Sequence, residues 1–89
     1  MSGWRGDGEL FLYREGARVR VRLELRRVPD RLGRTGRWAG AFAVEPLGVL
    51  VPGRGVLVLP NGTEAEVMVE GYDALTGRGD LIGIDTAPF

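Results

Sequence analysis

The chain has 89 residues and no net charge, because twelve arginines balance twelve acidic residues. A chain of this length forms one domain, so we expect a single β domain over residues 1–89, with residues 1–7 as an N-terminal arm. The sequence has no histidine, no cysteine and one serine, which removes the most common general base, metal ligand and nucleophiles. We therefore expect no enzymatic activity, no cofactor and no metal site.

Two further features of the composition bear on location and partners. No apolar run reaches the length of a membrane span, and residues 1–13 lack the basic start and apolar middle of a signal peptide. We therefore expect a cytoplasmic protein without membrane contact. Residues 1–40 contain ten arginines and five acidic residues, whereas residues 41–89 contain two arginines and seven acidic residues. This dipole favours partners with a complementary distribution of charge.

Alternation of apolar and polar residues predicts short strands throughout the chain and no helix longer than about two turns. The first two strands are expected at about 8–14 and at 17–28, with EG at 15–16 as a two-residue hairpin turn. That turn sets the expected cross-strand pairs, which are Tyr13 with Arg18 and Phe11 with Arg20. The alternation slips at 26–27, which predicts a β-bulge that bends the second strand around a small barrel.

The strongest local signal is GVLVLPNGTEAEVMVEGY, residues 55–72. Pro60, Asn61 and Gly62 suit successive positions of a type I turn that ends in a left-handed residue. This loop pairs Leu59 with Thr63 and directs one set of side chains inward: Leu57, Leu59, Ala65, Val67 and Val69. Further strands are expected at 37–45 and 80–85.

Six strands, or seven, at short spacing are typical of a small antiparallel β-barrel or a two-layer sandwich. We favour a partly open barrel. The alternation predicts one core, formed by Val19, Val21, Leu23, Trp38, Phe42, Leu57, Leu59 and Val67.

The charged residues form two rows with the same two-residue step, a basic row in the second strand and an acidic row after the Asn-Gly turn. If these strands are not sheet neighbours, the rows could meet between two copies of the chain or on another protein, and outward apolar side chains would complete the interface. We therefore hypothesise a non-catalytic interaction or assembly module that binds a protein partner or forms a homo-oligomer. The predicted interface comprises Phe11, Tyr13, Arg18, Arg20, Arg22, Glu64, Glu66, Met68 and Glu70.

Three alternatives use the same sequence features differently. Aromatic residues interleaved with arginines are typical of surfaces that bind single-stranded nucleic acid, although a neutral chain with an acidic second half is a poor match for that function. A carbohydrate-binding module would stack sugars on Trp4, Trp38 and Tyr72, but the position of Trp38 favours the core. With no partner, the arginines form a solvent-exposed face and pair across the hairpin with Glu9.

The tripeptide RGD occurs twice, at residues 5–7 and 78–80. It is known as a cell-adhesion signal, but so short a motif arises readily by chance in a chain this rich in arginine and glycine. Both copies precede a predicted strand, so we interpret them as turn sequences.

The segments RWAG (37–40), GVLVLPNGTEAEV (55–67) and GRGDLIGIDTAPF (77–89) carry a resemblance. Over about its last two thirds, the chain resembles small uncharacterised β-proteins of high-GC actinobacteria and their phages. Those proteins share a Trp-x-Gly strand, a Leu-Pro-x-Gly hairpin and a Gly-rich last strand ending near Pro-Phe. The resemblance implies an accessory role, either as a domain appended to other machinery or as a small component of a phage particle, and it assigns no functional residue.

Overall fold

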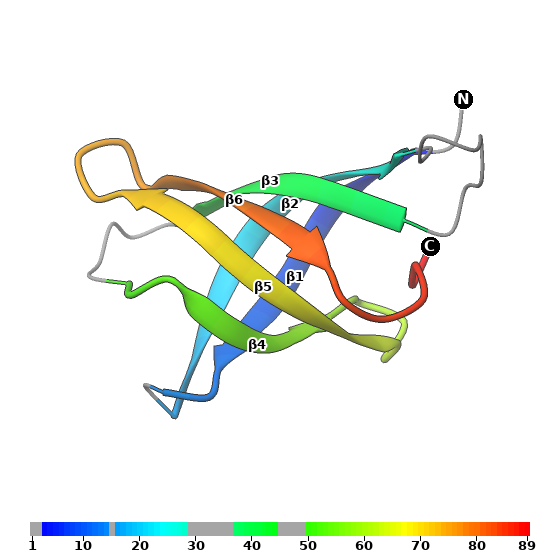
Figure 1. Ribbon diagram of the computed structural model, residues 1–89, viewed down its shortest axis with the longest axis horizontal. Helices are drawn as coiled ribbons and strands as arrows, with labels where there is room; N and C mark the ends of the chain where they lie inside the picture. The colour runs from blue at the N-terminus through cyan, green and yellow to red at the C-terminus, as the bar shows by residue number, and fades with distance from the viewer. Residues whose placement is uncertain (1–2, 15, 29–36, 45–49) are drawn as a thin grey trace.

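A computed structural model describes residues 3–14, 16–28, 37–44 and 50–89. These residues form six strands: β1 (Gly3–Leu12), β2 (Ala17–Val28), β3 (Arg37–Val44), β4 (Gly53–Val58), β5 (Glu64–Asp73) and β6 (Arg78–Gly83). All neighbouring strands are antiparallel, in the order β1-β2-β3-β6-β5-β4, and β4 also pairs with β1 (Figure 1). The predicted small all-β barrel is confirmed, but the expectation that it is partly open is wrong, because the pairing of β1 with β4 closes it. No helix in the described part of the chain has the length and apolar character needed to cross a membrane.

The inward side chains of all six strands form one core. Seven of the eight predicted core residues are buried, and Val19 is partly buried and packs against them. The same cluster contains residues that had not been named as core, among them Leu10, Leu12, Val44 and Leu81. The core prediction is therefore confirmed, and the core extends further around the barrel than the sequence analysis proposed.

Strand β1 begins at Gly3, so the predicted arm is wrong for residues 3–7, which belong to the barrel. The inward positions of this segment are Trp4, Gly6 and Gly8. A Cβ atom at Gly6 would lie 2.8 Å from the Trp4 ring, so the glycine leaves room for the indole to fold back over the strand. Because two of the three inward residues are glycines, the segment lacks the apolar alternation by which strands are recognised.

The β1–β2 turn is longer than the two residues expected. Gly16 has a φ of 66° and donates a hydrogen bond of 2.9 Å to the carbonyl oxygen of Leu12, while Glu15 lies outside the described residues. The observed pairs are Leu12 with Ala17, Phe11 with Arg18, Glu9 with Arg20 and Asp7 with Arg22. The predicted register is therefore wrong by two residues, a shift that leaves every side chain on its predicted face.

The bulge predicted in β2 is also wrong. Pairing with β3 runs without interruption through Arg26 and Arg27, and the slip in the pattern places Arg27 on the inward side at the end of the barrel. The bulge of this sheet lies in β5, between Val69 and Gly71, where Glu70 has no paired residue in β6.

The β4–β5 turn matches its prediction. The backbone N–H of Leu59 donates to the carbonyl oxygen of Thr63, and that of Gly62 donates to Leu59, both at 2.9 Å. Gly62 has a φ of 88°, the left-handed conformation expected for it. The side-chain oxygen of Asn61 accepts a hydrogen bond of 2.9 Å from the Thr63 N–H. Leu57 pairs with Ala65, as the three-residue loop requires.

Both RGD tripeptides lie inside strands, in β1 and β6, and not in turns that precede them. The turn interpretation is therefore wrong. Each central glycine lies beneath an aromatic ring: a Cβ atom at Gly6 would meet Trp4, and one at Gly79 would meet Phe42. Packing in the barrel accounts for both glycines.

Candidate functional site

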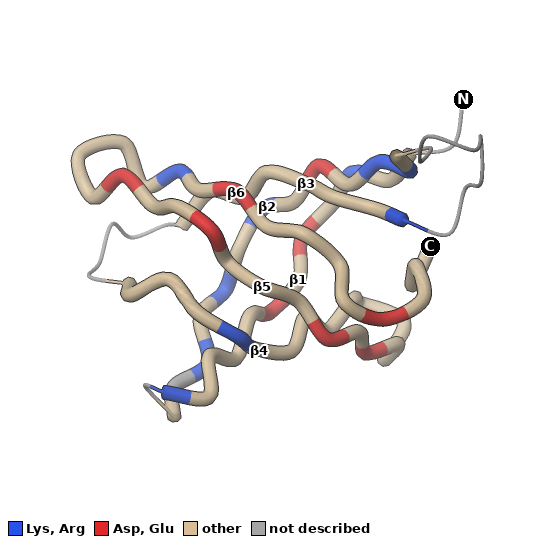
Figure 2. Tube along the Cα trace, viewed as in Figure 1, with Lys and Arg blue, Asp and Glu red and all other residues tan. Residues whose placement is uncertain are grey.

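The basic and acidic rows lie on opposite sides of the barrel. They belong to β2 and β5, which are separated by two strands in either direction around the closed sheet. In Figure 2, basic positions recur along β2 and acidic positions recur along β5. The two strands are therefore not sheet neighbours, which is the condition on which the interaction hypothesis depends.

The outer surface of β1 and β4 lies between these rows and carries apolar side chains. Phe11, Val56 and Val58 are partly buried there, and Tyr13, which is 51% exposed, contacts the Phe11 ring edge-on at 6.0 Å between centroids. The strand register also aligns residues of β2, β1, β4 and β5 in two transverse rows, which run across the strands. The first is Arg18, Phe11, Val56, Glu66, and the second is Arg20, Glu9, Val58, Glu64. Each row begins with a basic residue on β2 and ends with an acidic residue on β5. We call these two rows together with Tyr13 the β1–β4 face.

Some charges of this face are already paired within the chain. Arg18 lies 3.9 Å from Glu9, and Arg54 lies 2.8 Å from Glu66. These pairs are exposed to solvent, so each contributes little to stability and can exchange for a partner. Among the described residues, neither Arg20 nor Glu64 has an opposite charge within ion-pair distance. These two residues stand at the two ends of one row.

Three predicted interface residues are not part of this face: Met68 lies at its border, and Arg22 and Glu70 lie outside it. Met68 pairs with Arg54, whose carbonyl oxygen accepts a hydrogen bond from the Tyr13 N–H, so Met68 borders the face. Arg22 pairs with Asp7, at 3.5 Å between their charged atoms, and lies beyond the second row. Glu70, at the bulge of β5, is also outside the face. Seven of the nine predicted residues therefore lie on or beside the β1–β4 face, the arginines at its β2 edge and the glutamates at its β5 edge, whereas Arg22 and Glu70 lie outside it.

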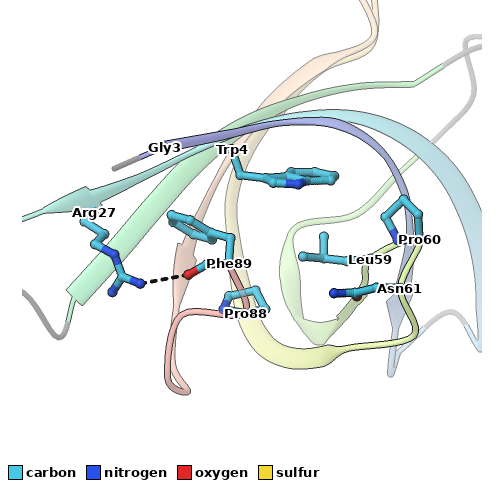
Figure 3. A pocket seen from close by; sticks show the side chains of 8 residues that line it. All are labelled: Gly3, Trp4, Arg27, Leu59, Pro60, Asn61, Pro88 and Phe89. Carbon is cyan, nitrogen blue, oxygen red and sulfur yellow. Dashed lines mark hydrogen bonds between the residues drawn. The ribbon is translucent and has the colours of Figure 1, made fainter. Parts of the chain in front are cut away.

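A cavity of about 460 Å³ opens at one end of the barrel, where no site was predicted from the sequence. Its lining comes from the start of β1, the end of β2, the β4–β5 turn and the last two residues: Gly3, Trp4, Arg27, Leu59, Pro60, Asn61, Pro88 and Phe89 (Figure 3). Four separate segments contribute, so no local motif marks the site. One feature of the sequence could have indicated the site: Trp4 alternates with Gly6 and Gly8, as an inward residue of a strand would. These residues belong to the segment that was predicted to begin as an N-terminal arm.

The three residues considered for sugar stacking do not form a common surface. Trp38 is 2% exposed and belongs to the core. Tyr72 stacks on Phe42, with 6.2 Å between ring centroids and an interplanar angle of 2°. Trp4 lines the end cavity, next to the turn from which β5 starts, whereas Tyr72 lies near the other end of β5.

Within the described ranges, no cluster of three or more carboxylate side chains is arranged to hold a metal ion. Comparisons with protein-family models, with curated proteins and with solved structures found no match for this chain. The resemblance to actinobacterial and phage proteins stays a prediction.

Proposed function

We propose that the protein is a non-catalytic interaction module that self-associates through the β1–β4 face. The observation that supports this proposal is the order of side chains across the face, which runs from basic through apolar to acidic in the row Arg18, Phe11, Val56, Glu66. An apolar centre with a polar rim is the usual composition of a protein interface. A basic edge opposite an acidic edge makes the surface complementary to itself.

The geometry of such a dimer follows from its symmetry. In an isologous dimer, the same patch is used by both copies and is related by a two-fold axis. An axis parallel to the strands, lying between β1 and β4 in the plane of contact, places the β2 edge of one copy on the β5 edge of the other. Arg20 then lies on the same side of the dimer as Glu64 of the second copy, and the apolar centres meet. Both residues lack an ion-pair partner among the described residues of their own chain.

A charge exchange tests this arrangement by sedimentation equilibrium. The Arg20→Glu variant carries two acidic ends in this row, and the Glu64→Arg variant carries two basic ends. We expect the unaltered protein to form dimers and each variant alone to be monomeric because like charges oppose each other at both contacts. An equimolar mixture of the two variants restores both contacts, so we expect heterodimers.

Glu70→Arg is the matched control, because it makes the same change of charge on the same strand but outside the face. We expect this variant to associate like the unaltered protein. Failure of the unaltered protein to associate, or dimers in both single variants, would overturn the proposal.

The nucleic-acid alternative predicts a different pattern with the same proteins. Binding of a fluorescent single-stranded oligonucleotide would be lost in Arg20→Glu and strengthened in Glu64→Arg, because one change removes and the other adds a phosphate-binding charge. Mixing the variants would restore nothing. A self-associating module is compatible with a cytoplasmic location and with the accessory or phage-structural role that the resemblance implies.

A further inference from the structure

The end cavity is built mainly from flat apolar groups. Figure 3 shows the indole of Trp4 lying over a space that is bordered by Phe89, Leu59 and Pro60. Its volume of about 460 Å³ is within the range of ligand sites in proteins, and such sites are usually apolar with a few polar groups. Trp4 and Phe89 are partly buried and pack against the core, so their rings are held in place without a ligand.

The last residue is fixed at this site by contacts with two strands. The Nη2 atom of Arg27 donates a hydrogen bond of 2.7 Å to the main-chain oxygen of Phe89, and its guanidinium lies 5.3 Å from the centre of the Phe89 ring. The Trp38 ring meets the Phe89 ring edge-on, at 6.0 Å between centroids. The wall formed by Phe89 is therefore part of the folded barrel, and the cavity is preorganised.

The polar side chains of the cavity offer hydrogen-bond donors. The side-chain oxygen of Asn61 already accepts from Thr63, and its amide nitrogen points toward the cavity (Figure 3). Arg27 contributes further N–H groups, because a guanidinium has five donors and no acceptor. Among the described residues, the indole N–H of Trp4 has no hydrogen-bond acceptor and is not sealed from solvent. No acidic side chain lines the cavity, and the main-chain oxygen of Phe89 is already bound by Arg27.

We propose that this cavity binds a proline-rich peptide segment in the polyproline II conformation. Each proline in such a segment has a carbonyl oxygen but no N–H, so its backbone presents acceptors alone. This requirement matches a site whose free side-chain groups are donors. Proline rings also dock against aromatic side chains in known proline-rich recognition, where the extended conformation is preformed.

The same inventory argues against a sugar. Every sugar hydroxyl brings a donor that needs an acceptor, and the lining side chains offer no free carboxylate. This site is separate from the β1–β4 face, so the proposal does not depend on self-association.

Two-dimensional ¹⁵N–¹H NMR of the full chain tests the proposal, because the chain has two tryptophans and therefore two indole N–H signals. We expect a decaproline peptide to shift the Trp4 signal in a saturable manner. The Trp38 signal should shift much less, since that N–H is bound to the carbonyl oxygen of Asp85 at 2.7 Å in the core. A Gly-Ser peptide of equal length should leave both signals unchanged.

Asn61→Asp is the informative variant, because it keeps the oxygen that accepts from Thr63 and removes the amide donor. We expect it to bind decaproline roughly two- to tenfold more weakly, the effect of one lost hydrogen bond. Trp4→Phe, which keeps a ring without a donor, should weaken binding similarly and assigns the Trp4 signal by its disappearance. Glu70→Gln, an exposed position outside both the cavity and the β1–β4 face, should bind the peptide as the unaltered protein does.

Three results would overturn the proposal. The first is no saturable shift of the Trp4 signal at millimolar decaproline, and the second is an equal shift with the Gly-Ser peptide. The third is a saturable shift with a neutral oligosaccharide such as cellotriose but none with decaproline, which would assign the cavity to sugars. Each can be obtained whether or not the protein forms dimers, so failure here is distinguishable from failure of the proposed function.

Discussion

The β1–β2 and β4–β5 hairpins are neighbours in the barrel but arrange their outward charges differently. In the β1–β2 hairpin, opposite charges alternate between the strands, and three cross-strand ion pairs form: Arg5–Glu24, Arg18–Glu9 and Arg22–Asp7. In the β4–β5 hairpin, acidic residues collect on β5, and Arg54 is the one basic residue of the two strands. In the two strands of the first hairpin, three of the six arginines are therefore paired internally, and Arg20 is one that has no ion-pair partner among the described residues.

The turns of the two hairpins also differ in how strongly they specify the register. Pro60, Asn61 and Gly62 each satisfy a distinct requirement of the β4–β5 loop. In the β1–β2 turn, Gly16 meets the need for a left-handed residue, but nothing else in the sequence decides the loop length. Stability in both hairpins is nevertheless expected to rest on the shared core.

The largest effect is expected where the hairpins join. Leu10 of β1 and Leu57 of β4 are paired and fully buried. We expect Leu10→Ala and Leu57→Ala each to lower the free energy of unfolding by about 2–5 kcal/mol, because each leaves a cavity in the core. The double variant should lose less than the sum, since neighbouring truncations share one cavity. Urea unfolding measures all three, and a loss confined to one hairpin would show that the hairpins do not unfold together.

A smaller effect is expected at the turn glycines. Gly16 and Gly62 have φ values of 66° and 88°, and a Cβ atom at either position would meet no atom within 4 Å. Alanine at either site therefore adds backbone strain alone, on the order of 1 kcal/mol. We expect equal losses in thermal unfolding. A silent Gly16→Ala would mean that the β1–β2 turn relaxes to another conformation, and the two turns would then differ in rigidity as well as in sequence.

Most of the barrel could be predicted from alternation and turn chemistry, and the errors have physical causes. A two-residue shift of register returns every side chain to the same face, so periodicity cannot distinguish Phe11 opposite Arg18 from Phe11 opposite Arg20. Alternation did predict which side chains point outward on β2 and β5, because it reports which face of the sheet a side chain occupies. The end cavity could not be predicted, because contacts between distant segments, such as Arg27 with Phe89, are set by how the barrel closes.

The ion pairs should contribute still less. The side chains of Arg5 and Glu24 are 77% and 63% exposed, whereas those of Arg54 and Glu66 are 56% and 31% exposed. Double-mutant cycles with glutamine should give coupling energies of about 0.2–1 kcal/mol for each pair. The Arg54–Glu66 coupling should be the larger and less sensitive to salt, because partial burial reduces screening. Equal couplings that vanish together in high salt would show that burial does not distinguish the two hairpins.

The smallest effect is expected for Asn61→Asp, in the turn that specifies its own register. Aspartate keeps the oxygen that accepts a hydrogen bond from the Thr63 N–H, and the residue is exposed, so the added charge stays hydrated. We expect a change in stability within about 0.5 kcal/mol, as for most exposed substitutions. Gly62→Ala, at the next position, should cost more because its strain lies in the backbone and cannot be relieved by solvent. If chemical unfolding gave the two variants the same stability, the left-handed Gly62 would not be what holds this turn, and the register of β4 with β5 would need another cause.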